Sequence, residues 1–326
     1  MTNRIAYQMA EELRKASKVA LFSHVSPDGD CIGSMLGLGL ALEALGKEVY
    51  MYNSDPIPRN LSFLPGVEKI QTELPAPFPE ILLFVDCTDL QRVKLENEVF
   101  PADSLILNLD HHISNQNFGH INWIDSQASA TGEIVYALIR LLDVNLTQDI
   151  ATNLYTAILT DTGSFKYSNT TSKTHQIAGE LMDSGINFAD IHHHVFDRTP
   201  QAKLELLRRG LNQLQILAQG QFAMMTLHKF DFEEIGAEES LGEGLIDHAR
   251  TLEGVEVAAL MKEVNSSVIR VSLRSNRWFD VNKIASHFGG GGHKRAAGCT
   301  LDMPLEEAQK LLVQKVEEEL ALGRSC

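Results

Sequence analysis

Histidine and aspartate residues that could bind metal ions cluster in the segment SHVSPDGDCIGS, directly after an apolar run. His24, Asp28 and Asp30 lie within seven positions, and an imidazole with two carboxylates at this spacing could form half of a metal site. Similar residues follow other apolar runs downstream, namely Asp86, the triplet Asp110-His111-His112, and Asp161. Together they predict a site for two metal ions, and hence phosphoester chemistry.

The candidate ligands combine carboxylates with imidazoles, and they are His24, Asp28, Asp30, Asp86, His111 and Asp161. Four carboxylates in one crevice would repel each other unless cations compensated their charge. Imidazole suits transition metals, whereas Mg²⁺ prefers an octahedron of oxygens. We therefore expect two Mn²⁺ ions, with Mg²⁺ or Co²⁺ as substitutes, while zinc and iron stay open. One bridging carboxylate would hold the two ions about 3.5 to 4 Å apart.

The elements that must position these residues follow from an alternation of short apolar runs with helix-length amphipathic stretches in the first half of the chain. This alternation predicts a parallel α/β sheet, in which ligands bind outside the carboxyl ends of the strands. His24, Asp86 and Asp110 fall at or just past such ends, and Asp161 is expected at the C-terminal end of a helix. The expected strands are KVALFS (18–23), EVYMY (48–52), ILLFVD (81–86) and SLILNLD (104–110).

The pattern changes to adjacent strands from about Gln215, with a hairpin about Gln219-Gly220 and a second strand pair in VEVAALMKEV and SVIRVSLRS. A helix (DVNKIASHF), the loop GGGGHKRAAG, a short strand (CTLDM) and a terminal helix follow. This order predicts an α+β domain. We expect a first domain over 1–187, a helical linker over 188–214 that includes three consecutive histidines, and a second, smaller domain over 215–326.

Length and composition agree with this division. A chain of 326 residues exceeds the usual size of a single core, and its 44% hydrophobic and 22% charged residues are ordinary for a globular protein. No apolar run approaches the roughly 20 residues that span a bilayer, and the N-terminus lacks a signal-peptide pattern, so a cytoplasmic protein without a membrane partner is expected. Scattered cysteines without C-x-x-C spacing are expected to be reduced thiols; they are Cys31, Cys87, Cys299 and Cys326.

The formal net charge of -15 argues against a long duplex as partner, because such binding requires many phosphates to be neutralised. Between Ser266 and Gly298, however, six Lys and Arg residues face one acid, which leaves a local charge of +5. This segment contains Gly289 to Gly292, whose successive N–H groups could form an anion-binding nest. The segment has neither P-loop nor dinucleotide-fingerprint spacing. We expect a phosphate or nucleotide pocket formed by Arg274, Ser275, Gly289, Gly290, Gly291, Gly292, His293 and Arg295.

The chain closely resembles the DHH/DHHA1 phosphoesterase superfamily, and within it the branch of nanoRNases that also act on 3′-phosphoadenosine 5′-phosphate (pAp). The resemblance covers essentially the whole chain and implies an N-terminal DHH domain with a mainly parallel sheet flanked by helices, a C-terminal α+β DHHA1 domain, and an active site in the cleft between them. The matching motifs are HVSPDGDCIGS (24–34), VDCTDLQRV (85–93), LDHHISN (109–115), ILTDTGSFKYSNT (158–170), SLRSN (272–276) and DVNKIASHFGGGGHKRAAG (280–298).

The resemblance also implies roles for the residues. One ion would be held by His24, Asp28 and Asp86, and the other by Asp30, Asp86, His111 and Asp161, which makes Asp86 the bridging ligand. His112 would face the scissile phosphate as an electrostatic stabiliser or general acid. Asp110 would orient the imidazoles. The DHHA1 domain would hold the nucleotide while the DHH domain hydrolyses it.

The expected function is therefore that of a phosphodiesterase and phosphatase that degrades short RNA oligonucleotides to mononucleotides, as an exoribonuclease of either polarity, and converts pAp to AMP. A second hypothesis keeps the same phosphoester hydrolysis but changes the substrate to cyclic di-AMP or its linear product pApA. A metal-stabilised nucleotide-binding regulator without catalysis is a third reading. Members of the superfamily are often homodimers, and no sequence feature identifies a dimer surface here.

Overall fold

The computed structural model describes residues 2–95 and 100–323, and the chain divides into two compact units, Met1–Arg198 and Thr199–Cys326. This division lies inside the segment 188–214 that we expected as a helical linker. Helix α6 (Phe188–His192) and a π-helical turn (His193–Asp197) belong to the first unit, and α7 (Gln201–Asn212) belongs to the second. Leu206 of α7 is fully buried in the core of the second unit, so this helix is part of that unit's packing.

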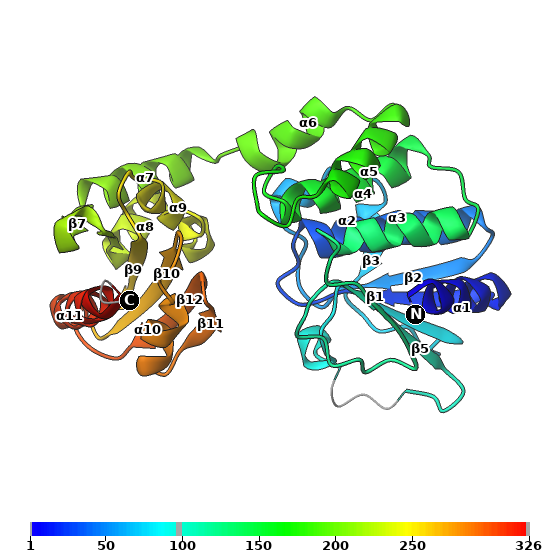
Figure 1. Ribbon diagram of the computed structural model, residues 1–326, viewed down its shortest axis with the longest axis horizontal. Coiled ribbons are helices and arrows are strands. Elements are labelled where there is room, and N and C mark those ends of the chain that lie inside the picture. The colour runs from blue at the N-terminus through cyan, green and yellow to red at the C-terminus, as the bar shows by residue number, and fades with distance from the viewer. Residues whose placement is uncertain (1, 96–99, 324–326) are drawn as a thin grey trace. The chain divides into compact units, whose positions relative to one another are not determined.

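The strands described in the first unit form one sheet in the order β3-β2-β1-β4-β5-β6, and every pairing in it is parallel (Figure 1). The predicted parallel sheet is thus confirmed, and all four expected strands are present. The strands are β1 (Lys18–Phe22), β2 (Glu48–Tyr52), β3 (Ile70–Gln71), β4 (Ile81–Val85), β5 (Leu105–Asp110) and β6 (Ile121–Ile124). We did not expect the short β3 or the edge strand β6.

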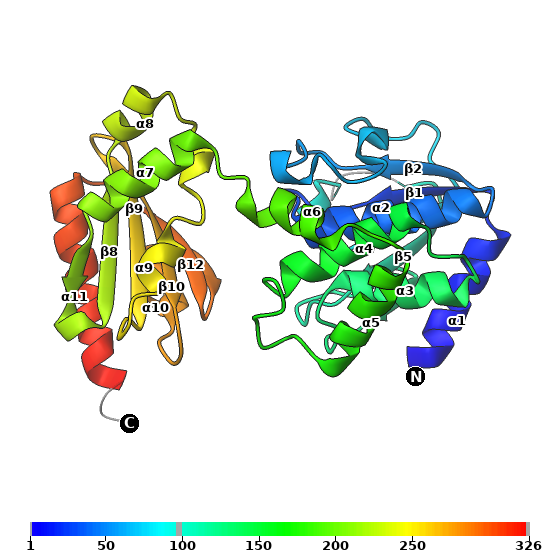
Figure 2. The same ribbon diagram turned by 90° about the horizontal axis from the view of Figure 1, so that it is seen from above.

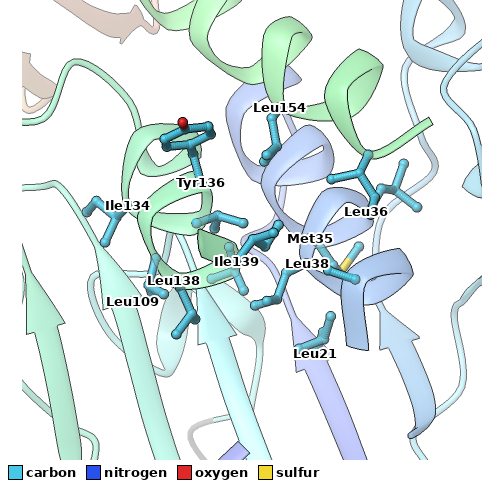
Figure 3. Packing of buried hydrophobic residues seen from close by; sticks show 14 of the residues in the cluster. Leu21, Met35, Leu36, Leu38, Leu109, Ile134, Tyr136, Leu138, Ile139 and Leu154 are labelled. Carbon is cyan, nitrogen blue, oxygen red and sulfur yellow. The ribbon is translucent and has the colours of Figure 1, made fainter. Parts of the chain in front are cut away.

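Helices cover one face of this sheet, and their apolar residues form the main core of the unit. Leu21 of β1 and Leu109 of β5 point into this layer beneath Leu38 and Leu138 (Figure 3). Aromatic residues and short turns fill the other face, where Phe22 and Phe84 stack. The helices are α1 (Thr2–Lys15), α2 (Gly29–Ala44), α3 (Thr131–Leu141), α4 (Gln148–Asp161) and α5 (Ser172–Asp183), with 3₁₀ turns at Arg59–Leu61, Val67–Lys69 and Gln91–Val93.

The second unit contains a mixed sheet in the order β11-β12-β10-β9-β8-β7, in which β8 and β9 are parallel and the other pairs are antiparallel. Its strands are β7 (Gln215–Leu217), β8 (Phe222–Leu227), β9 (Val257–Asn265), β10 (Val268–Ser275), β11 (Gly291–His293) and β12 (Ala296–Leu301). The two expected strand pairs, β7 with β8 and β9 with β10, are confirmed.

Helices cover both faces of the mixed sheet (Figure 2). Helices α10 (Val281–His287) and α11 (Leu305–Gly323) pack on one face, while α7, α8 (Lys229–Ile235) and α9 (Ile246–Arg250) pack on the other. A 3₁₀ turn at Glu239–Gly242 lies between α8 and α9 in the chain. Over the parts of the chain that the structure describes, none of the helices has the length and apolar character required to cross a membrane.

The glycine segment differs from the loop that we expected. Gly291 and Gly292 belong to β11, which pairs with the start of β12 to form a hairpin. A Cβ on Gly290 would approach the carbonyl oxygen of Gly298 to 2.2 Å, and one on Gly292 would approach that of Ala296 to 2.5 Å. Gly290 and Gly292 are therefore required by the close approach of backbone to backbone, and no local pattern in the sequence shows this.

Candidate functional site

Strand ends and helix ends bring the predicted ligands together in the first unit. His24 lies two residues after β1, Asp86 directly follows β4, and Asp161 is the last residue of α4. Asp28 is the N-cap of α2, where its side chain accepts a hydrogen bond from the N–H of Cys31. These elements end at the carboxyl edge of a parallel sheet, where crevices of α/β folds form.

Potential metal ligands form three groups, and within each group the ligand atoms lie within 4.8 Å of one another. In full, the groups are His24 with Asp28 and Cys31, Asp86 with His111 and His112, and Asp30 with His111 and Asp161. All six predicted ligands thus converge, although which of them bind which ion stays a prediction.

Asp86 lies at the centre of the constellation. Its Oδ2 is 3.4 Å from Nε2 of His24, and its Oδ1 is 3.8 Å from Nε2 of His111, so its two oxygens face the two halves of the site. The residue has a φ of 58°, an uncommon backbone conformation for aspartate that is held by a hydrogen bond from its N–H to the carbonyl of Leu109. Such strain persists where the surroundings impose it, often at functional sites.

Groups at the N-terminus of α3 donate hydrogen bonds to two of the carboxylates. These contacts were not predicted from the sequence. The N–H groups of Thr131 and Gly132 donate to the two oxygens of Asp30 at 2.7 and 2.9 Å. The hydroxyl of Thr131 donates to Oδ1 of Asp86 at 2.7 Å. Both acids are almost fully buried, and the positive end of the helix dipole stabilises the charge of Asp30. Thr131 lies 101 residues from Asp30 in the chain, so no local pattern indicates this contact.

Close packing of α2 on α4 brings Asp30 near Asp161. A Cβ on Gly29 would approach the side chain of Thr160 to 2.4 Å, and one on Gly33 would approach the carbonyl oxygen of Asn153 to 2.4 Å. Glycine at every fourth position of α2 thus lets the backbones approach closely. This spacing was a signal in the sequence that could have predicted the contact.

Asp110, His112 and Asn115 form a hydrogen-bonded network beside the constellation. Asp110 is fully buried, and its Oδ1 lies 2.8 Å from Nδ1 of His112. Its Oδ2 accepts a hydrogen bond from the side-chain amide of Asn115 at 2.6 Å, and that amide also contacts the oxygen of Asn108. The pair of Asp110 and His112 was predicted, whereas the role of Asn115 in holding Asp110 was not. The network fixes the orientation of the His112 ring.

Residues after Asp161 form a strained turn that supports this acid. Gly163, Ser164 and Phe165 all have φ values of 55 to 61°. The amide of Asn169 donates to the carbonyl oxygens of Asp161 and Ser129, and so links this turn to the start of α3. The turn therefore connects the end of α4 to the segment that holds Asp30.

Charges within the constellation shift the pKa values of its members. Burial and the nearby carboxylates of Asp86 and Asp28 raise the pKa of Asp161 to about 6, against the attraction of His111. Burial and the same acid neighbours raise the pKa of Asp30 well above its usual range. The hydrogen bond to Asp110 raises the pKa of His112 to about 9. Carboxylates that resist ionisation in this way are stabilised by cations at the same place.

Asp86 behaves in the opposite way to Asp30 and Asp161. Burial alone would raise the pKa of Asp86, but contact with His24 and the charges of His112 and His111 hold it below its usual range. Its carboxylate therefore stays ionised and available as a ligand. The donor set of imidazoles and carboxylates suits Mn²⁺, as the sequence indicated.

The described cysteines behave as predicted. Cys31, Cys87 and Cys299 are free and buried. Burial raises the pKa of the Cys31 and Cys87 thiols well above the usual range, so both are neutral side chains that pack beside the carboxylates. Cys31 also lies in the first ligand group, which we did not anticipate. Cys326 lies outside the described residues.

The predicted substrate-binding residues of the second unit lie on or beside the β10, β11 and β12 strands. Arg274 pairs with Ala296, which pairs with His293, so the three share one row across the sheet. The hydroxyl of Ser275 is buried and donates to the carbonyl of Phe279, which accepts also from Arg295. Arg274 and His293 are thus brought together, whereas Ser275 and Arg295 hold the loop after β10.

The expected anion nest does not form in its first half. The N–H groups of Gly289 and Gly290 donate to the carbonyls of Ser286 and Ala285 at the end of α10. These two amides are therefore occupied within the protein, because the turn after a helix satisfies its last carbonyls. A contribution of the glycine segment to substrate binding stays a prediction.

Comparisons with known proteins agree with this architecture. Residues 18–158 match the N-terminal domain of the DHH family, and residues 224–322 match the DHHA1 domain. The chain is 36% identical over 317 residues to the bifunctional oligoribonuclease and PAP phosphatase NrnA of Thermus thermophilus, which covers 96% of this chain and 94% of that relative. The enzyme of the same name from Bacillus subtilis is 26% identical over 299 residues, with coverages of 90% and 92%.

A solved structure extends the agreement to three dimensions. An exopolyphosphatase-related protein from Bacteroides fragilis has a TM-score of 0.88 to this chain at 26% identity, and the match covers 97% of each chain. The two family matches lie in different units of this chain, and both curated relatives carry the name of an oligoribonuclease and phosphatase. The chain therefore belongs to the DHH/DHHA1 phosphoesterase family.

Proposed function

We propose that this chain is a Mn²⁺-dependent two-metal phosphoesterase that degrades short RNA oligonucleotides to mononucleotides and converts pAp to AMP. The observation that carries the proposal is the convergence of six candidate imidazole and carboxylate ligands, with Asp86 among them and His112 beside Asp86. The substrates printed in the names of the Thermus thermophilus and Bacillus subtilis relatives support the same choice.

The proposal assigns one ion to His24, Asp28 and Asp86, and the other to Asp86, Asp30, His111 and Asp161. Ions bound there would supply a hydroxide nucleophile at neutral pH and stabilise the charge that develops on the phosphate. The donors of α3 keep the carboxylate of Asp30 fixed before any ion arrives. This preorganisation supports a metal site better than a flexible group of acids would.

His112 acts on the phosphate in this proposal. Because Asp110 engages Nδ1 of the ring at 2.8 Å, Nε2 is the atom left to face a substrate. Nε2–H donates a hydrogen bond to a phosphate oxygen, and passes its proton to the leaving oxygen as the ester bond breaks. Asp110 and Asn115 orient the ring and do not touch the substrate.

The nucleotide itself is held by the second unit in this proposal. Arg274 and His293 lie in one row of the sheet and together offer a cation and an imidazole to a phosphate. Replacing both with alanine should raise KM for a dinucleotide far more than for a generic phosphoester. The exposed Lys283 on α10 provides a control, because Lys283→Ala should change neither value. Equal effects of the double variant on both substrates would refute this assignment.

The central experiment is an assay of the full chain with Mn²⁺ against a 5′-labelled dinucleotide, pAp, a 24-mer and cyclic di-AMP. We expect mononucleotides from the dinucleotide and AMP from pAp, with slower turnover of the other two. Asp86→Asn should abolish turnover, and Asp183→Asn at the exposed end of α5 should not. Fastest turnover of cyclic di-AMP would favour the cyclic-dinucleotide reading. No product from any of the four would favour a regulator without catalysis.

A further inference from the structure

The strand register of the second unit creates a row of cationic residues that the site described above does not use. Arg270 of β10 pairs directly with Lys262 of β9 on one side and with Thr300 of β12 on the other. Arg274 lies four residues further along β10, so its side chain points to the same face of the sheet. At a rise of about 3.3 Å per residue, the two rows are about 13 Å apart.

Between the two rows, β10, β12 and β11 carry only small side chains or none, while Leu260 of β9 belongs to the core beside them. Ser272 of β10 pairs with Gly298, which pairs with Gly291 of the glycine hairpin. A pocket of 420 Å³ opens at the row of Lys262 and Arg270, with Ser272 and Gly298 among its lining residues. The face therefore has a cationic row at each end and a flat floor between them.

Lys262 is buried to an unusual degree for a lysine. Its side chain is 11% exposed, and within the described part of the chain its ammonium has one carboxylate partner, Glu239, at 3.6 Å. The same Oε1 atom of Glu239 contacts Nη1 of Arg270 at 2.7 Å. One carboxylate thus faces two cations, which leaves an excess positive charge in the pocket. A charge removed from water is costly unless it is paired, so this pocket favours an incoming anion.

We propose that Lys262 and Arg270 form a second phosphate subsite, which binds a phosphodiester of the same oligonucleotide whose end is held by Arg274 and His293. The proposal rests on the proposed function and names its preferred substrate class, oligonucleotides long enough to reach both rows. Glu239 is the resident counter-ion, and the phosphate takes its place against Arg270. The small pAp molecule carries one nucleoside and does not span the two rows.

Binding of a fluorescently labelled pentaadenylate to the full chain in EDTA tests the subsite without catalysis. Arg270→Gln should raise the Kd for pentaadenylate about tenfold, because a charge-assisted contact to phosphate is lost. Its effect on competition by unlabelled pAp should be much smaller. The slope of log Kd against log salt concentration should fall by about 0.7, the value for one phosphate contact on a single strand. Glu239→Gln should tighten pentaadenylate binding, since the competing carboxylate is removed.

Lys310→Gln is the matched control, because Lys310 is an exposed cation on α11, which packs on the opposite face of the sheet. It should leave the Kd for pentaadenylate unchanged. Arg270 is mostly exposed, so Arg270→Gln is not expected to disturb folding, and a circular dichroism spectrum checks this.

Several results would overturn the subsite. They are absence of pentaadenylate binding by the unaltered protein, an unchanged Kd in Arg270→Gln, and equal weakening of pentaadenylate and pAp. Failure of the proposed function looks different. In that case the unaltered protein hydrolyses neither substrate with Mn²⁺, yet Arg270→Gln still weakens pentaadenylate binding in EDTA.

Discussion

Replacement of Thr131 by valine removes one hydroxyl from the support of the candidate metal site and changes little else. Thr131 is fully buried, and its hydroxyl donates to Oδ1 of Asp86 at 2.7 Å. Valine is also β-branched and of similar shape, and it keeps the backbone N–H that donates to Asp30 at 2.7 Å. The variant therefore places a methyl group against a buried, ionised oxygen.

The structure allows the magnitude to be worked out. A hydrogen bond to a charged group contributes about 1.5 to 3 kcal/mol, and a buried acceptor that loses its donor costs an amount of this order. We expect the free energy of unfolding of the metal-free first unit to fall by about 2 kcal/mol. Mn²⁺ affinity should fall about 10- to 100-fold, because the carboxylate of Asp86 is no longer oriented by its partner.

Urea unfolding in EDTA measures the first quantity. The measurement uses a Trp278→Phe background, so that the buried Trp123 is the remaining tryptophan and reports the first unit. Titration calorimetry with Mn²⁺ measures the second. Thr131→Ser is the control, because it keeps the hydroxyl and should behave nearly as the unaltered chain does. If Thr131→Val unfolds within about 0.5 kcal/mol of the unaltered protein and binds Mn²⁺ equally well, the hydrogen bond does not support the site.

Three further predictions follow from the same geometry. The folded, metal-free protein keeps a proton on Asp161 up to about pH 6, whereas the unfolded chain releases this proton near pH 3.8. The free energy of unfolding should therefore fall as the pH rises from about 3.8 to about 6. Urea titrations should show this slope, and Asp161→Asn should flatten it; an unchanged slope contradicts the assignment. Asn115→Ala should lower kcat about 10- to 100-fold, because Asn115 holds Asp110 and so orients the ring of His112. In a His112→Asn background the same substitution should have little additional effect on kcat. Gly163→Ala should destabilise the fold by about 1 to 3 kcal/mol in urea unfolding, because its φ is +55° and a Cβ would meet an aromatic ring at 2.3 Å. Gly185→Ala, at φ +81° in open space, should cost less, and equal costs would refute the packing argument.

Much of the first unit could be predicted from sequence because its signals are local. Apolar runs such as ILLFVD and SLILNLD are short and continuous, as expected for strands buried on both faces, and they became β4 and β5. Parallel strands have their carboxyl ends on one edge, so the placement of Asp86 and Asp110 followed directly. The alternation of elements was enough to predict that candidate ligands far apart in the sequence lie close together.

Contacts between distant segments could not be predicted in this way. Thr131 is separated from Asp30 by 101 residues and from Asp86 by 45, and no periodicity connects them. A run of four glycines is typical of a loop, and the sequence therefore predicted a loop here. Pairing with β12 instead makes the segment part of a hairpin. Of the four glycine N–H groups that we expected to bind an anion, those of Gly289 and Gly290 instead donate to carbonyls at the end of α10.

The sequence by itself determined the family and the order of the two domains, and residue types at strand ends predicted the candidate ligands. The tertiary structure decided how that chemistry is supported and extended. It placed Thr131 against Asp86, Asn115 against Asp110, and Lys262 beside Arg270. The physical reason is that these pairs depend on strand register and helix docking, which arise from packing of the whole unit and leave no mark in a short stretch of chain.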